Sequence, residues 1–164
     1  MNRPLGGNEI FLQPGEFYFG DTSTRIRTLL GSCVAITLWH PARVIGGMCH
    51  YMLPNRQKPG GPLDGKYADE AMALFLLEMA RHHTRPEDYQ VKLFGGGTMF
   101  PGYSEENSVA HNNINAARLL VTRHHLRLSA EDLGRNGHRD VIFDISSGHV
   151  WVCHQDLNES SKRL

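Results

Sequence analysis

The spacing of hydrophobic residues along the chain predicts two helices and about seven strands. The helices cover residues 68–83 and about 108–124, where apolar side chains recur every three or four positions and so share one face. Those positions are Met72, Phe75, Leu76 and Met79 in the first helix, and Ala110, Ile114, Ala117 and Val121 in the second. The strand-like segments are β-branched, apolar or alternating, and they cover residues 25–30, 33–39, 44–53, 89–94, 126–129, 141–145 and 149–153, with a short candidate at 16–19.

The order of these segments favours an α+β fold. Most strands follow one another in pairs instead of alternating with helices, which favours a mixed or antiparallel sheet with helices packed on one side. A single domain is predicted over residues 16–154, after a flexible N-terminal arm (1–15) and before a polar C-terminal tail (155–164). The proline- and glycine-rich segment 54–66 is predicted to be a surface loop.

Composition and charge narrow the function classes. The 164 residues suffice for one domain with its own core. The 17 basic and 17 acidic side chains balance, which argues against the basic surface that binds nucleic acid or an anionic membrane. No apolar run approaches the roughly 18 residues that span a bilayer, and the N-terminus lacks the pattern of a secretory signal. We therefore expect a cytoplasmic protein with no nucleic-acid partner and no membrane insertion.

The three cysteines point to a candidate nucleophile. An odd number cannot all pair within one chain, which fits a reducing compartment where each thiol is free, metal-bound or catalytic. Cys33 follows Gly31 and Ser32 at the start of an apolar strand. Backbone N–H groups at such a break lower the pKa of a thiol and bind a developing oxyanion, so Gly31 and Ser32 are predicted to support a nucleophilic Cys33. The alternative is that Cys33 is a small, buried core residue.

The next strand supplies a partner for this thiol. If the two strands form a hairpin centred between Pro41 and Ala42, Cys33 lies directly opposite His50, and opposed residues share a face with Cβ atoms about 4.5–5.5 Å apart. His50 would then hold Cys33 in an ion pair and later act as acid and base. Pro41 also fits a longer turn, and a register shift of one residue would set Cys33 against Cys49 instead.

A third group usually orients the imidazole of such a pair. Thr28, on the preceding strand, is one candidate, and Ser32 and Asp21 are others. A lone threonine in a strand is more often there for its β-propensity, so the identity of this third group stays open.

Metal binding is the main alternative to cysteine catalysis. Cys49-His50 and Cys153-His154 are two adjacent Cys-His pairs. Structural zinc sites usually separate their ligands by two to five residues, whereas successive side chains on a strand point to opposite faces. We therefore predict neither a metal nor an organic cofactor.

Three segments around these residues resemble a known family. They are TLLGSCVA at 28–35, GGMCHYMLP at 46–54 and KLFGG at 92–96, and the likeness extends over about residues 10–153. On these motifs the sequence resembles the chemoreceptor glutamine deamidases (CheD) of bacterial chemotaxis.

The resemblance implies a specific activity and fold. Such proteins are protein-glutamine glutaminases: they hydrolyse glutamine side chains of methyl-accepting chemotaxis receptors to glutamate through a cysteine thioester, without a cofactor. The implied fold is a mixed β-sandwich flanked by helices, similar to the catalytic domain of cytotoxic necrotising toxins. The implied partners are the cytoplasmic helical domain of the receptors and a CheC-type chemotaxis phosphatase. A protein with only an interaction role is the competing interpretation, and transfer to an amine instead of water is a conceivable side reaction.

The family pattern assigns roles to individual residues. Cys33 corresponds to the family's cysteine and His50 to its histidine. The third residue is a threonine, which in some members stands six positions before the cysteine, where this chain has Arg27; the nearest threonine here is Thr28. Other departures are Ala110 in place of a glycine, with Asn113 retained, and Arg135 in place of a glycine. A catalytic Cys33 is expected to be alkylated near neutral pH much faster than the other two cysteines.

Overall fold

The computed structural model describes residues 7–100 and 108–157, which form nine strands, two α-helices and a short 3₁₀ turn. The helices are α1 (Ala68–Arg81) and α2 (Val109–Arg123), and the 3₁₀ turn is Pro86–Asp88. The strands are β1 (Asn8–Leu12), β2 (Phe17–Gly20), β3 (Thr24–Leu30), β4 (Val34–His40), β5 (Ile45–Tyr51), β6 (Gln90–Gly95), β7 (Arg127–Leu133), β8 (His138–Asp144) and β9 (Val150–Gln155).

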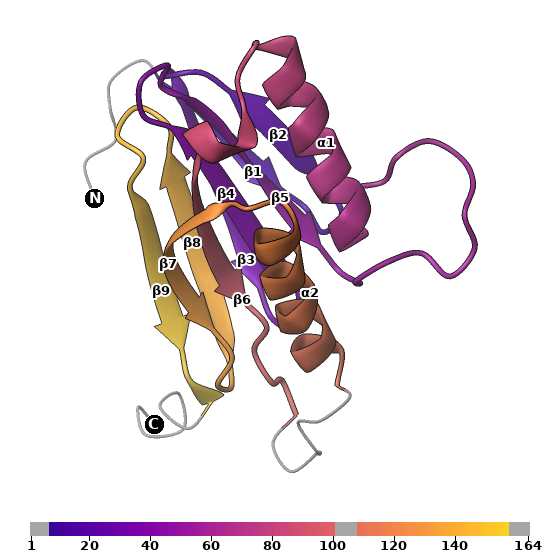
Figure 1. The fold of residues 1–164 in the computed structure, drawn as a ribbon. Helices are drawn as coiled ribbons and strands as arrows, with labels where there is room; N and C mark the ends of the chain where they lie inside the picture. Colours follow the sequence, from indigo (N-terminus) through magenta and orange to yellow (C-terminus); the bar gives the residue numbers. More distant parts are fainter. Residues whose placement is uncertain (1–6, 101–107, 158–164) are drawn as a thin grey trace.

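The strands form two sheets that pack against each other (Figure 1). One sheet has the order β1-β3-β8-β9 and the other β2-β5-β4-β6-β7. Each contains one parallel pair, β1 with β3 and β6 with β7, and the remaining pairs are antiparallel. Both helices pack on the outer face of the five-stranded sheet, which gives three layers: sheet, sheet and helices. The predicted α+β fold with mixed sheets and helices on one side is confirmed.

Two hydrophobic cores meet on opposite faces of β4. Val34, Ile36 and Leu38 face the helices, whereas Ala35 faces the four-stranded sheet, where Met48 of β5 joins it. Because both faces of β4 are covered, its sequence is apolar except for Thr37 and His40 and does not alternate with polar residues at every second position. Cys33 packs against the core between the sheets, the same core to which Ala35 belongs.

The predicted flexible arm contains a strand. Asn8–Leu12 (β1) pairs in parallel with β3, and the Leu12 side chain is buried. The arm was predicted from its glycines and prolines, but pairing with β3 provides hydrogen bonds and a covered face that local composition does not reveal. At the other end, β9 extends to Gln155. Residues 1–6 of the predicted arm and residues 158–164 of the predicted tail lie outside the described residues.

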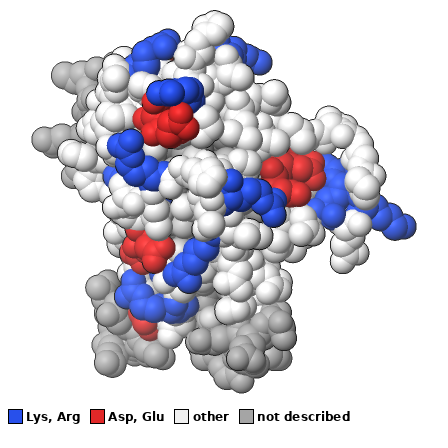
Figure 2. Space-filling model, in the orientation of Figure 1, with Lys and Arg blue, Asp and Glu red and all other residues white. Residues whose placement is uncertain are grey.

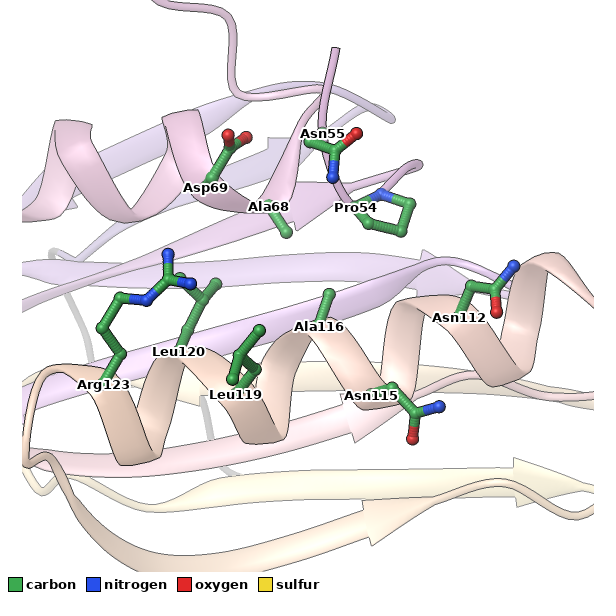
Figure 3. Close-up of a pocket in the computed structure, with 10 residues that line it drawn as sticks. All are labelled: Pro54, Asn55, Ala68, Asp69, Asn112, Asn115, Ala116, Leu119, Leu120 and Arg123. Carbon is green, nitrogen blue, oxygen red and sulfur yellow. The ribbon is translucent and has the colours of Figure 1, made fainter. Parts of the chain in front are cut away.

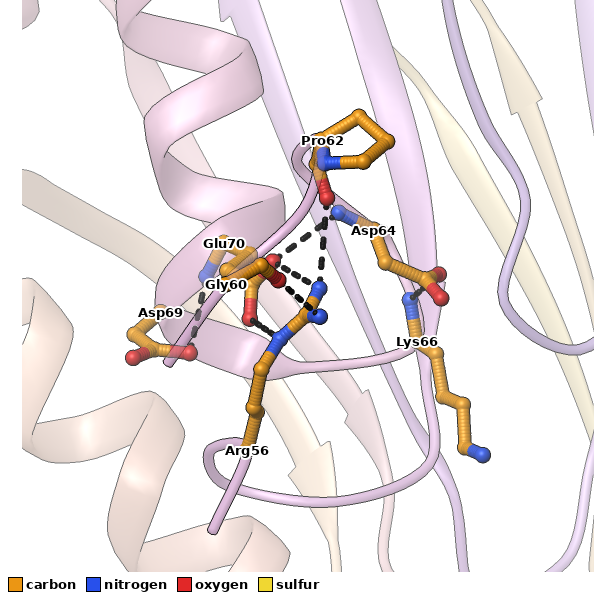
Figure 4. Close-up of polar contacts among 7 residues, drawn as sticks. All are labelled: Arg56, Gly60, Pro62, Asp64, Lys66, Asp69 and Glu70. Atoms are coloured by element: carbon orange, nitrogen blue, oxygen red, sulfur yellow. Dashed lines mark hydrogen bonds and ion pairs between the residues drawn. The ribbon is translucent and has the colours of Figure 1, made fainter. Parts of the chain in front are cut away.

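The predicted surface loop between β5 and α1 is fastened to the helix (Figure 4). The Arg56 guanidinium donates to both carboxylate oxygens of Glu70, at 2.9 and 2.7 Å, and also to the carbonyl oxygens of Gly60 and Pro62. The hydrogen bonds from Arg56 lower the pKa of the Glu70 carboxyl. Arg56 therefore closes the loop on itself and joins it to the first turn of α1.

The surface agrees with the balanced composition. The face seen in Figure 2 carries basic and acidic side chains interspersed over a largely uncharged surface, without a broad area of one sign. Within residues 7–100 and 108–157, no helix is both long and apolar enough to cross a membrane.

Candidate active site

Cys33 lies in a bend between the end of β3 and the start of β4, and the carbonyl groups of this bend are all held. The Gly31 and Cys33 oxygens accept hydrogen bonds from the amides of Gly97 and Gly96, each at 2.9 Å. The Ser32 oxygen accepts one from the side-chain amide of Asn113 at 3.2 Å. No backbone acceptor within the described residues faces the N–H groups of Ser32 and Cys33. The bend is thus anchored through its acceptors, whereas its Ser32 and Cys33 donors have no backbone acceptor in the described part of the chain.

The glycines that follow β6 allow this close packing. Gly95 and Gly96 have φ angles of +111° and +67°, a region that residues with a side chain rarely adopt. A Cβ atom on Gly95 would lie 2.3 Å from the Cys33 carbonyl oxygen. The Gly95-Gly96-Gly97 sequence therefore lets one backbone segment lie directly against another beneath Cys33.

The β4–β5 hairpin has a register two residues away from the predicted one. His50 pairs with Ala35, not with Cys33. The turn is centred between Ala42 and Arg43 because Val44, which the sequence pattern placed in the strand, takes a left-handed φ of +52° within the turn. Neither the predicted register nor the one-residue alternative, which pairs Cys33 with Cys49, is correct.

Cys33 and His50 nevertheless share one face of the sheet. Cys33 directly precedes β4 and packs against the core that contains Ala35 and Met48, and His50 is two residues from Met48 on β5, so it points the same way. His50 is therefore the diagonal neighbour of Cys33, and diagonal positions of an antiparallel pair lie about 7–8 Å apart at Cα, within reach of a long side chain. The register therefore places the predicted pair in diagonal positions and not directly opposite each other.

Thr28 lies against the His50 ring. The Thr28 hydroxyl is 2.6 Å from His50 Nδ1 and 2.9 Å from the main-chain oxygen of Leu12. A carbonyl oxygen only accepts, so the single hydroxyl hydrogen is donated to Leu12 and the hydroxyl oxygen accepts from Nδ1. The hydrogen of the neutral ring is therefore on Nδ1, which leaves Nε2 with a free lone pair. Nε2 has no hydrogen-bond partner among the described residues.

Burial favours the neutral forms of both predicted catalytic groups. It lowers the pKa of His50, whose side chain is 2% exposed, from 6.5 to about 4. Burial also raises the pKa of the half-buried Cys33 thiol. These directions favour a thiol and a neutral imidazole over the predicted resting ion pair. Fast alkylation of Cys33 from a preformed thiolate stays a prediction.

Asp21, another candidate for the third group, lies away from His50, as does Arg27, which stands where some family members have the threonine. Asp21 accepts hydrogen bonds from the amide and hydroxyl of Ser23 in the β2–β3 turn. Arg27 points to the outer face of the four-stranded sheet, where its Nε donates to Asp140 at 2.9 Å. Of the three candidates Thr28, Ser32 and Asp21, only Thr28 contacts the His50 ring within the described residues.

Sequence reasoning assigned no site role to two buried polar residues. Asn113 occupies the buried face of α2, where its amide bonds the Ser32 carbonyl. Arg139 of β8 is fully buried and donates to the carbonyl oxygens of Gly95 and Gly134. A polar side chain at a helix position predicted to be buried was the available signal for Asn113, which follows Ala110 by three residues and precedes Ala117 by four.

The residues of the proposed metal alternative do not come together. Cys49 is buried in the five-stranded sheet, and Cys153 is exposed on β9 of the other sheet. Within residues 7–100 and 108–157 no three His, Cys, Asp or Glu side chains gather as a metal site would require.

A separate groove of about 360 Å³ lies between the two helices (Figure 3). Its lining includes Asp69 at the start of α1 and Leu119 and Arg123 on α2. It lies on the helix side of the five-stranded sheet, whereas His50 faces the other sheet, where Thr28 contacts it. The groove is therefore not the space next to the Cys33–His50 pair.

Comparison with solved structures identifies the fold. The chain resembles YlmD from Geobacillus stearothermophilus with a TM-score of 0.50 at 15% sequence identity. The match covers 79% of this chain and 60% of YlmD. At this level of identity the likeness concerns the fold alone.

Comparison with known sequences identifies the family. The sequence profile described as "CheD chemotactic sensory transduction" matches residues 52–154. A probable chemoreceptor glutamine deamidase CheD of Pseudomonas savastanoi pv. phaseolicola is 54% identical, covering 99% of this chain and 93% of the relative. The protein of the same name from Pseudomonas syringae pv. tomato is 52% identical, covering 99% and 98%. These two matches also span Cys33 and His50, and together with the profile they show that the chain belongs to the CheD family.

Proposed function

We propose that this protein hydrolyses the side-chain amide of selected glutamines on chemotaxis receptors, yielding glutamate and ammonia. The relatives named chemoreceptor glutamine deamidases support the substrate class. The observation that carries the chemistry is the hydrogen bond between Thr28 and His50 Nδ1, which directs the basic Nε2 away from Thr28 on the face that His50 shares with Cys33.

The first half-reaction forms a thioester. As Cys33 Sγ bonds to the carboxamide carbon of glutamine, His50 Nε2 takes the thiol proton, and the carbonyl oxygen becomes an oxyanion. The N–H groups of Ser32 and Cys33, which lack backbone acceptors among the described residues, are the proposed donors to that oxyanion. The carbon–nitrogen bond then breaks, and the Nε2 proton leaves with the amide nitrogen as ammonia.

The second half-reaction restores the enzyme. A water molecule gives one proton to His50 Nε2 while its oxygen attacks the thioester carbon. The carbon–sulfur bond breaks, the Nε2 proton returns to Cys33, and the product is the glutamate side chain. The hydrogen on Nδ1 stays on the ring throughout and is donated to the Thr28 hydroxyl oxygen, because the Thr28 hydroxyl hydrogen is donated to Leu12. No step requires a metal or an organic cofactor.

The same proposal assigns a setting and partners. The glutamines would lie on the cytoplasmic helical domain of methyl-accepting chemotaxis receptors, which requires a cytoplasmic protein. A CheC-type chemotaxis phosphatase is a second proposed partner, which the family resemblance supports.

The proposal is tested by incubating the protein with a receptor cytoplasmic fragment and following ammonia release and the mass of its peptides. We expect glutamines to become glutamates, and Cys33→Ala to abolish both signals. Cys153→Ala is the matched control, since Cys153 is exposed on the opposite sheet. Undiminished turnover by Cys33→Ala would rule out the nucleophile. Adding a primary amine distinguishes hydrolysis from transglutamination by the mass of the modified peptide.

A further inference from the structure

Asn113 of α2 joins the two segments that carry the predicted nucleophile and base. Its side-chain amide donates to the Ser32 carbonyl at 3.2 Å and to the Met52 carbonyl at 2.9 Å. Ser32 directly precedes Cys33, and Met52 follows His50 by two residues. Both hydrogens of one NH₂ group are thus used to hold the Cys33 segment and the His50 segment against the same helix turn.

The surroundings of Asn113 indicate that its structural role depends on the two hydrogen-bond donors of its side chain. The residue is fully buried, and its Oδ1 has no hydrogen-bond partner within the described part of the chain. An unpaired buried acceptor is unfavourable, and an apolar residue of similar shape would avoid that cost. Both groups facing Nδ2 are carbonyl oxygens, so only a donor fits there.

A second bond fixes the helix at this point independently of the side chain. The Tyr51 hydroxyl donates to the main-chain oxygen of Asn113 at 2.5 Å, and Tyr51 is buried. Helix α2 is therefore attached to β5 beside His50 even without the Asn113 side chain. Removing that side chain frees the Ser32 and Met52 carbonyls and leaves the helix in place.

We propose that Asn113 is a positioning residue for deamidation, setting the Cys33 bend relative to His50 through its two carbonyl hydrogen bonds. This inference rests on the proposed function, because its main test measures kcat for receptor deamidation. Asn113 does not act on the substrate: it sets the geometry in which the Cys33 thiol can pass its proton to Nε2 and in which the Ser32 and Cys33 N–H groups meet the oxyanion. Its loss should therefore lower kcat more than it changes KM for the receptor.

Asn113→Asp is the main test, because it preserves shape and makes the donors depend on pH. At neutral pH a carboxylate faces two carbonyl oxygens and cannot donate to them. We expect kcat for receptor deamidation to fall by about tenfold or more, with KM nearly unchanged. Burial next to acceptors favours the protonated acid, which regains one donor. The deficit relative to wild type should therefore shrink as pH falls from 8 to 5.5.

Two variants separate positioning from stability. Asn113→Leu removes both donors at similar volume, and its deficit should persist at every pH. Tyr51→Phe also removes one buried hydrogen bond to residue 113 but leaves both carbonyl contacts, so it should retain near-wild-type kcat at a matched loss of thermal stability. The proposal is overturned if Asn113→Leu keeps wild-type kcat, if the Asn113→Asp deficit does not respond to pH, or if Tyr51→Phe loses as much kcat.

A receptor-free readout distinguishes failure of this inference from failure of the proposed function. In a Cys153→Ser background, the pH dependence of Cys33 alkylation by iodoacetamide reports the surroundings of the thiol. Release of the bend should move the alkylation midpoint of Asn113→Leu toward that of an ordinary thiol, and Tyr51→Phe should leave it unchanged. An unchanged midpoint in Asn113→Leu argues against positioning, whereas absence of deamidation in wild type overturns the proposed function alone.

Discussion

Neighbouring positions on β3 face opposite sides of their sheet, so an offset of one residue decides which side chain reaches His50. Arg27 faces outward to Asp140, and Thr28 faces inward to the His50 ring. Some family members have their threonine six residues before the cysteine, where this chain has Arg27. Because Arg27 faces outward, it does not contact His50 here. The hydroxyl that orients the imidazole here comes from Thr28, five residues before Cys33.

Removing that hydroxyl should impair turnover. Thr28→Val keeps the shape of the side chain but leaves the Nδ1 hydrogen and the Leu12 carbonyl without a partner, so the orientation and tautomer of the ring are no longer fixed. We expect kcat to fall about 10–100-fold and stability to fall by about 1–3 kcal/mol. Steady-state kinetics and urea unfolding measure the two effects. Thr28→Ser retains the hydroxyl and should recover most of the activity; equal losses in both variants would contradict the assignment.

The pKa of His50 predicts the acid limit of the reaction. Only the neutral imidazole accepts a proton, and burial moves the pKa of His50 from 6.5 down to about 4. The kcat/KM profile should therefore stay level through pH 6 and decline only toward pH 4. The same shift means that unfolded His50 takes up a proton below about pH 6.5 while folded His50 does not, so its contribution to stability is complete above pH 6.5 and is lost toward pH 4. An acid limb centred near 6.5 would contradict a His50 pKa lowered by burial.

At the scale of single elements, the β4–β5 turn shows where sequence reasoning reached its limit. The two strands were predicted, but their register was wrong by two residues because Val44 takes a left-handed φ of +52° in the turn. A β-branched residue is typical of strands and rare in the left-handed conformation, so the presence of valine at position 44 favoured the assignment of this residue to the strand. By contrast, the Gly31-Ser32 break was placed correctly between two strands, and the glycines after β6 lie where the backbone contacts the Cys33 bend.

The strain at Val44 can be measured. Asparagine adopts the left-handed region more readily than valine, so Val44→Asn should stabilise the protein by about 1 kcal/mol and raise its melting temperature. Val44→Thr is the matched control, because it keeps the branched Cβ and should give no gain. Differential scanning calorimetry of the three proteins tests this, and a lower melting temperature for Val44→Asn would show that the valine contacts outweigh the strain.

At the scale of the whole molecule, the candidate site lies where the two sheets and helix α2 meet. The sequence alone could not predict this arrangement of the elements. Leu12 of β1, Thr28 of β3 and His50 of β5 come from both sheets. Local patterns predicted most elements, and the family motifs proposed Cys33 and His50 as candidate catalytic residues. The contacts among them depend on the parallel pairing of β1 with β3 and on the packing of one sheet on the other, which no local pattern encodes.

Arg139 links the two sheets at the same end of the molecule. From β8 of one sheet its guanidinium reaches the Gly95 and Gly134 carbonyls and the Asp132 carboxylate of the other, and Gly96, next to Gly95, holds the Cys33 carbonyl. Arg139→Met keeps the apolar stem but removes these donors.

Loss of those donors should destabilise the protein by about 1–3 kcal/mol, because the buried hydrogen bonds to the Gly134 carbonyl and the Asp132 carboxylate are lost, although the Gly95 carbonyl still accepts from the Gly134 amide. Deamidation should also slow, because the glycine segment beneath Cys33 loses its support. Arg27→Met is the matched control: it also breaks an Arg–Asp pair, but one that solvent reaches on the outer face of the sheet, so little stability is lost. Urea unfolding and receptor deamidation of both variants decide the matter. Equal effects in the two proteins would mean that Arg139 contributes no more at the sheet junction than an ion pair on the surface.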